Sequence, residues 1–145
     1  MTNVFDTLRE RGFVQQTSHE DKLAALLAEE KVTAYVGFDP TSDSLHVGHL
    51  LPLMALVHLG RAGHRPIALI GGGTAMIGDP SGRTELRKMM SKETVNSNFE
   101  GIKKQLQEIL SRNSIDMVIL NNADWIWDLN YIDFLRDIGS HFSVN

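Results

Sequence analysis

The fold is decided by residues 32–49, which read VTAYVGFDPTSDSLHVGH. The first seven of these residues are mostly β-branched, aromatic or small and apolar, which is typical of a short strand. The residues from Asp39 onward are turn-forming by composition, and the chain from Gly48 to Arg61 is apolar over a helical length. Gly63 then provides a typical stop for a helix. The pattern predicts a strand, a loop and a helix in succession.

The same alternation continues along the chain. Residues 66–70 (PIALI) form a continuous apolar run, which suits a strand buried on both faces, and residues 117–120 (MVIL) form a third strand of the same kind. The spacing of apolar residues predicts helices over 4–13, from Ser18 to near Lys31, over 93–112, and in one or two short pieces over 125–138. Ser18 and Asp21, three residues apart, predict a capping box at the start of the second of these helices. Strands that alternate with helices predict an α/β fold with a doubly wound parallel sheet.

Composition sets the general class. A chain of 145 residues corresponds to about one domain, and its 42% hydrophobic residues can form a core. The net charge of −4 gives no general affinity for nucleic acid, and the absence of Cys excludes disulfides, Cys-ligated metals and thiol catalysis. No apolar run approaches ~18 residues, and the first residues carry no apolar signal segment. We therefore expect a cytoplasmic protein without a membrane partner.

One stretch of the chain is basic. Residues 83–112 carry 7 basic and 4 acidic side chains, whereas the segments on either side are acidic. This stretch is the candidate surface for a polyanion, and a solvated helix face is the simpler interpretation.

Two histidines mark the first candidate site. In a parallel sheet, ligands bind beyond the carboxyl ends of the strands, where the loops 39–49 and 71–84 lie. His46 and His49 are three residues apart, so they share a face of the helix, and Gly48 between them permits close approach to the backbone. Free N–H groups at a helix start attract anions, so these imidazoles indicate donors to phosphate oxygens. A metal pair without an obvious third ligand, or two structural histidines, are the alternatives.

Pro52 limits where the helix after these histidines can begin. Its missing N–H is harmless in the first turn of a helix and costly further in. The sequence therefore predicts that the helix begins between Val47 and Leu50.

The second loop, residues 71–84 (GGGTAMIGDPSGRT), lacks both common phosphate-binding patterns. Asp79 stands where a P-loop requires Lys, and Met76 stands where the dinucleotide-binding fingerprint requires its last Gly. Residues 79–82 (DPSG) match a type I turn. Local chemistry favours a turn in which Asp79 accepts a backbone N–H, with binding of a substrate ammonium as the alternative.

Residues 35–49 resemble the first signature of class I aminoacyl-tRNA synthetases in their bacterial tyrosyl form. Residues 78–82 (GDPSG) and 134–145 (FLRDIGSHFSVN) are also similar to those enzymes, so the resemblance covers essentially the whole chain. The resemblance implies a Rossmann-like catalytic domain. Residues 32–145 would be its first half, preceded by a helical segment at residues 1–31, and the second half would follow Asn145.

The resemblance also implies roles on the amino-acid side. Tyr35 matches a tyrosine whose hydroxyl bonds the substrate phenol. Gly37 and Asp39 match positions that line the cleft, and Thr74 and Asp79 match residues near the substrate amine.

The positions that match the ATP site lie in the loop and helix start after the first strand: Pro40, Thr41, His46, Gly48 and His49. Of these, Thr41 and the two histidines match the catalytic contacts to the phosphates, and Gly48 matches the close approach of the nucleoside. Arg83 and Arg87 match a basic stretch associated with pyrophosphate and the tRNA acceptor end.

The implied reaction is activation of L-tyrosine with Mg·ATP to tyrosyl-adenylate, followed by transfer to tyrosine tRNA. It needs neither a protein nucleophile nor a metal or cofactor held tightly by the protein, and the resemblance implies a homodimer. Residues 1–145 alone are expected to be inactive, because the opposite wall of the cleft would lie in the second half. A small nucleotidyltransferase with a His-x-Gly-His site and a non-catalytic fragment that retains the fold remain the alternatives.

Overall fold

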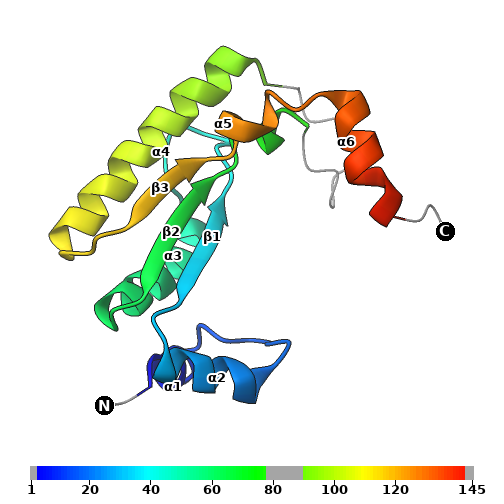
Figure 1. Cartoon of the computed structure of the whole chain (residues 1–145). Coiled ribbons are helices and arrows are strands. Elements are labelled where there is room, and N and C mark those ends of the chain that lie inside the picture. The colour runs from blue at the N-terminus through cyan, green and yellow to red at the C-terminus, as the bar shows by residue number, and fades with distance from the viewer. Residues whose placement is uncertain (1–2, 78–89, 143–145) are drawn as a thin grey trace.

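The computed structural model describes residues 3–77 and 90–142 (Figure 1). Along the chain the elements are α1 (Val4–Glu10), α2 (Glu20–Glu29), β1 (Thr33–Phe38), α3 (Val47–Arg61), β2 (Arg65–Ile70), the 3₁₀ turn η1 (Thr74–Met76), α4 (Lys92–Arg112), β3 (Val118–Asn121), α5 (Ala123–Ile126), α6 (Tyr131–Asp137) and the 3₁₀ turn η2 (Gly139–His141). No helix in these ranges is long and apolar enough to cross a membrane.

The three strands form one parallel sheet in the order β1-β2-β3. Phe38 pairs with Ile70, and Ile70 pairs with Asn121, so the three strands end at the same level. Figure 1 shows α1 and α2 at the amino-terminal end of this sheet, with α5 and α6 at its carboxyl end. The α/β class and the parallel sheet predicted from the sequence are confirmed.

The sheet is buried on one face only. In β2, Pro66, Ala68 and Ile70 are buried, whereas Ile67 and Leu69 on the other face are only half-buried. The prediction that this strand is buried on both faces is therefore wrong for the described chain. The strands lie in the sheet in the same order as in the chain, and each connection between parallel strands is expected to be right-handed. Two such connections in succession place both α3 and α4 on the same face of the sheet.

The core lies between that face and the helices. Its buried members come from α1, α2, β1, α3, β2 and α4: Val4, Phe5, Leu8, Leu27, Phe38, Leu53, Leu56, Val57, Leu59, Ala68, Ile70, Ile102, Leu106 and Leu110. In α4 the buried positions recur every three or four residues, which confirms the amphipathic helix predicted over 93–112. Helix α1 thus shares the core of the sheet.

Helix α3 begins within the range, Val47 to Leu50, that was predicted from the position of Pro52. The helix begins at Val47, so Pro52 is its sixth residue and lies just past the first turn. At the other end Gly63 has a φ of +90°, a conformation that favours glycine, and the chain turns there into β2.

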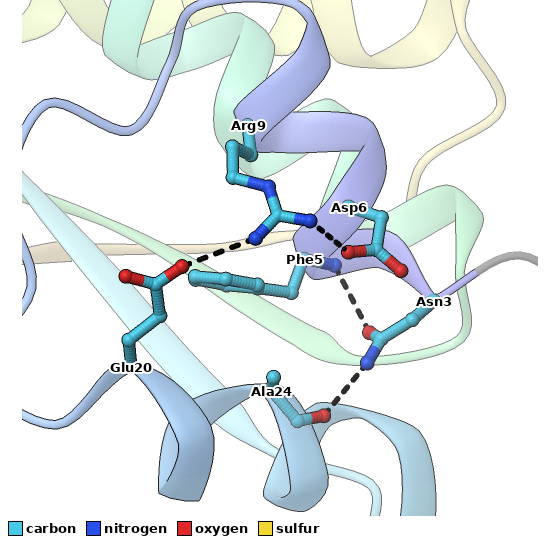
Figure 2. Close-up of polar contacts among 6 residues, drawn as sticks. All are labelled: Asn3, Phe5, Asp6, Arg9, Glu20 and Ala24. Atoms are coloured by element: carbon cyan, nitrogen blue, oxygen red, sulfur yellow. Dashed lines mark hydrogen bonds and ion pairs between the residues drawn. The ribbon is translucent and has the colours of Figure 1, made fainter.

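Helix α1 is tied to α2 by side chains at its first and second turns (Figure 2). The Asn3 side chain caps α1 by accepting from the Phe5 N–H at 3.0 Å and donates to the Ala24 carbonyl of α2 at 2.7 Å. Arg9 lies between Asp6 at 2.9 Å and Glu20 at 3.1 Å, but these three side chains are largely exposed. The capping residue therefore contributes more to stability than the ion pairs.

We expect Asn3→Ala to lower the free energy of unfolding by about 1–3 kcal/mol, because the change removes both a helix cap and a bond to α2. Arg9→Ala should cost less than ~1 kcal/mol, since water competes for exposed ion pairs. Urea unfolding of the two variants measures both values. A larger loss for Arg9→Ala than for Asn3→Ala would contradict this account.

Candidate functional site

The candidate site lies where the three strands end. Because Phe38, Ile70 and Asn121 are in register, the segments that follow them are neighbours. The Gly71 N–H donates to the Phe38 carbonyl at 2.9 Å, and the Asn122 N–H donates to the Ile70 carbonyl at 3.0 Å. The first bond joins the start of the second predicted loop to the end of β1, and the second joins the segment after β3 to the end of β2, at the carboxyl edge where α/β sheets bind their ligands.

His46 and His49 cap the start of α3 reciprocally. The Gly48 N–H donates to Nδ1 of His46 at 3.1 Å, and the His46 N–H donates to Nδ1 of His49 at 3.4 Å. The two rings are stacked with their centroids 3.7 Å apart. The sequence therefore predicted correctly that the two histidines share a face at the helix start.

These caps determine which nitrogen of each ring carries the proton. An Nδ1 that accepts a hydrogen bond is unprotonated, so the neutral imidazole carries its proton on Nε2. Partial burial and the neighbouring His46 lower the pKa of His49, and Asp39 opposes that shift only in part. The Nε2 atoms of the two rings are therefore the groups left to donate at the start of α3, and such donors suit phosphate oxygens.

Gly48 leaves space for the His46 ring beside it. A Cβ at residue 48 would lie 3.0 Å from both Cε1 and Nδ1 of His46, which is tighter than ordinary contact. Val47 beside it is 83% exposed, so the helix start is open to solvent. A side chain at residue 48 would therefore require the His46 ring to shift by a few tenths of an ångström.

Acidification is expected to destabilise the fold through His49 and His58. Partial burial is the largest cause that lowers the pKa of each below its ordinary value of about 6.5. Because the unfolded chain binds these protons more readily, the stability contributed by the neutral rings is complete above about pH 6.5 and is lost as the pH falls below it. Urea midpoints at pH 7.5 and 5.5 measure the loss. The difference should be smaller in His58→Gln, and an equal difference in both proteins would contradict the assignment.

Tyr35 and Gly37 lie on the uncovered face of β1. Tyr35 is 69% exposed, and a Cβ at Gly37 would meet no atom within 4 Å, so the space beside the tyrosine is open. Asp39 and Thr41 follow in the exposed part of the loop. Within residues 3–77 and 90–142, no hydrogen bond joins Tyr35 to the histidines.

Thr74 is held by an asparagine that sequence reasoning missed. Buried Asn122 accepts from the Gly73 N–H at 2.7 Å and donates to Oγ1 of Thr74 at 3.1 Å. The Thr74 hydroxyl in turn donates to the Gly71 carbonyl at 3.3 Å. The pair Asn121-Asn122 directly after a strand was the available signal, because polar groups at this edge face the ligand loops.

The remaining candidates are not all within the described chain. Asp79, Arg83 and Arg87 lie outside it. Among residues 3–77 and 90–142, no three His, Asp or Glu side chains gather into a group that could hold a metal ion.

Comparison with known proteins identifies the family. Residues 27–145 match the family described as tRNA synthetases class I (W and Y). The chain belongs to this family. The family and the α/β fold of this synthetase chain are those that the resemblance in residues 35–49 implied.

The similar proteins act on tyrosine. This synthetase chain is 58% identical over 145 residues to a tyrosine–tRNA ligase of Acetivibrio thermocellus and 57% identical to one of Clostridium botulinum. Each match covers 100% of the chain but 36% of the relative, so the chain spans about a third of the length of these ligases and is a homologue of their N-terminal catalytic region.

Solved structures agree with this assignment. A C-terminally truncated mitochondrial tyrosyl-tRNA synthetase of Aspergillus nidulans superposes with a TM-score of 0.90 at 27% identity, covering 100% of this chain and 44% of that one. The corresponding protein of Coccidioides posadasii has a TM-score of 0.85 at 29% identity, covering 99% and 42%.

Proposed function

We propose that this chain forms the first part of the amino-acid-activating site of a tyrosine–tRNA ligase. The observation that carries the proposal is the stacked His46–His49 pair, whose Nδ1 atoms accept backbone N–H groups and whose Nε2 atoms are left as donors at the open start of α3. Tyrosine, ATP and tyrosine tRNA are the proposed substrates. The tyrosine-specific relatives support tyrosine over tryptophan within the family.

The proposed chemistry needs positioned charge and no protein nucleophile. The carboxylate oxygen of tyrosine forms a bond to the α-phosphorus of ATP, which enters with Mg²⁺, and the bond to the leaving pyrophosphate breaks. Negative charge grows on the pyrophosphate in the transition state. Donors placed for that charge in advance lower the barrier, which is the role proposed for the Nε2–H groups of His46 and His49.

Residues near the two histidines are proposed to make the other contacts to ATP. Thr41 would contact the phosphates, and Pro40 and Gly48 would lie against the nucleotide. Arg83 and Arg87 are proposed for pyrophosphate and the tRNA acceptor end on the resemblance alone, since both lie outside the described residues.

On the amino-acid side, the open space over Gly37 is proposed to receive the substrate ring, with its phenol at the hydroxyl of Tyr35. Asp39 would line the cleft, and Thr74 and Asp79 would bind the amine. The bonds of Asn122 that fix Thr74 support a defined position for that hydroxyl.

The larger assembly is proposed on the same basis. Residues 1–31 would be a helical segment in front of the first half of the catalytic domain, residues 32–145. The complete protein would be a cytoplasmic homodimer, as the resemblance to bacterial tyrosyl enzymes implies.

Calorimetric titration of the complete gene product tests the proposal. We expect tyrosine to bind and a non-reactive tyrosyl-adenylate analogue to bind much more tightly, because the analogue occupies both halves of the site. Binding of CTP without binding of tyrosine would instead favour a nucleotidyltransferase. If none of the three ligands binds, the result would favour the alternative of a non-catalytic protein that only retains the fold.

Tyr35→Phe is expected to weaken the preference for tyrosine over phenylalanine. Loss of one neutral hydrogen bond costs about 0.5–1.5 kcal/mol, which is about a 2- to 12-fold loss of discrimination. The measurement is the ratio of kcat/KM for the two amino acids in pyrophosphate exchange. Unchanged discrimination would show that residue 35 does not face the substrate.

A further inference from the structure

One face of helix α4 contacts the loop that precedes the histidines. Asn98, Gly101 and Gln105 are spaced by three and four residues, so they lie on one face of the helix. The loop they meet connects β1 to α3 and lies about sixty residues earlier in the chain.

Side chains on this face of α4 bind the loop backbone at three residues. The side-chain amide of Asn98 donates to the Pro40 carbonyl at 2.9 Å, and both groups are buried. The side-chain oxygen of Gln105 accepts from the Leu45 N–H at 3.1 Å, while its nitrogen lies 3.5 Å from the Asp43 carbonyl. The loop is therefore fixed near both of its ends and in its middle.

Gly101 allows the helix to approach this closely. A Cβ at residue 101 would collide with the carbonyl of Asp43, which is backbone and cannot rotate away. A glycine in the middle of a 21-residue helix costs stability relative to alanine, so its presence is explained by the contact with the loop.

The held segment contains or adjoins the groups proposed to contact the phosphates. Thr41 follows Pro40 directly, and His46 follows Leu45 directly. The His46 N–H and ring then make the caps that orient His49 and α3. A shift of the loop backbone therefore moves the threonine and both imidazoles together.

We propose that Asn98, Gly101 and Gln105 are positioning residues that fix loop 40–45 and, through it, Thr41 and the histidine pair. The catalytic consequence rests on the proposed function, whereas the positioning itself does not. Since the histidines act on charge that grows in the transition state, loosening the loop lowers kcat by a larger factor than it raises the KM for ATP, and it leaves the KM for tyrosine nearly unchanged.

Hydrogen exchange in the chain itself tests the positioning. In Gln105→Ala, the Leu45 amide should exchange about 2- to 12-fold faster, which corresponds to the loss of one hydrogen bond. Gln107→Ala is the matched control, because Gln107 is an exposed glutamine on the same helix. Unchanged exchange in Gln105→Ala, or the same acceleration in both variants, overturns the proposal.

Kinetics of the complete gene product test the catalytic consequence. Asn98→Asp keeps the shape of the side chain but removes the donor, and it should lower kcat for pyrophosphate exchange by about 10- to 100-fold. Asn96→Asp, at an exposed position of the same helix, should have no such effect. Gln105→Ala serves the same purpose at a half-buried position if Asn98→Asp does not fold.

The possible results separate the two proposals. A fall in kcat with the KM for tyrosine changed less than twofold supports positioning, whereas an unchanged kcat, or an equal fall in the control, overturns its catalytic part. Absence of pyrophosphate exchange in the unaltered protein overturns the proposed function. In that case the hydrogen-exchange rate of the Leu45 amide alone tests the positioning.

Discussion

His46→Ala is expected to lower the rate of tyrosyl-adenylate formation by about 10²-fold or more, while the affinity for tyrosine changes little. The magnitude is that of losing one donor to charge that develops in the transition state. Because this charge is absent while tyrosine binds, the ground state does not depend on the imidazole. Pre-steady-state measurement of adenylate formation in the complete gene product gives the rate, and equilibrium titration gives the affinity.

His46→Asp is the informative control, because His46 also caps α3. An aspartate accepts from backbone N–H groups at a helix start, so it retains the cap, but its carboxylate offers no donor to a phosphate. We expect His46→Asp to be as stable as the unaltered protein and at least as slow as His46→Ala. An intact rate together with collapsed tyrosine binding would contradict the assigned role.

Phe38→Ala is expected to lower the free energy of unfolding by about 3–5 kcal/mol, the range for removing a buried aromatic side chain. Phe38 is 1% exposed at the end of β1, within the core beneath the site. Its ring also lies edge-on to that of His49, with centroids 5.9 Å apart. The change therefore affects both the core and the support of the histidine pair. Urea unfolding measures the loss.

Phe38→Leu separates these two effects. Leucine keeps most of the buried volume, so it should cost less than ~1.5 kcal/mol while removing the aromatic edge beside His49. A loss in Phe38→Ala below about 1 kcal/mol would show that the strand end is not part of the core.

The elements were predictable because each has its own periodicity. The strand at 33–38 and the helices from Val47 and Lys92 carry patterns of apolar residues that need no tertiary information. The uncovered face of β2 was not predictable in this way. Ile67 and Leu69 are as apolar as the residues of the buried face, and only the packing of the crossover helices decides which face is covered.

Local sequence was also misleading at one helix start. Ser18 and Asp21 resemble a capping box, but α2 begins after His19 and has no side-chain cap. A capping pattern specifies which bonds are available, and the path of the chain from α1 decides whether the backbone can use them.

The candidate site was predictable where its residues are neighbours in sequence. His46, Gly48 and His49 come together within one helical turn. Asn98 and Asn122 contact their partners 58 and 48 residues away, so the sequence could not indicate which groups they bind. Their polar side chains in buried positions show their role only once the loops are placed.

The most direct test of the central claim is amino-acid-dependent exchange of pyrophosphate into ATP by the complete gene product. The account predicts exchange that requires L-tyrosine and is lost in His46→Ala, with little exchange when tryptophan or phenylalanine is supplied instead. Exchange that proceeds equally well with tryptophan, or without any amino acid, would contradict it.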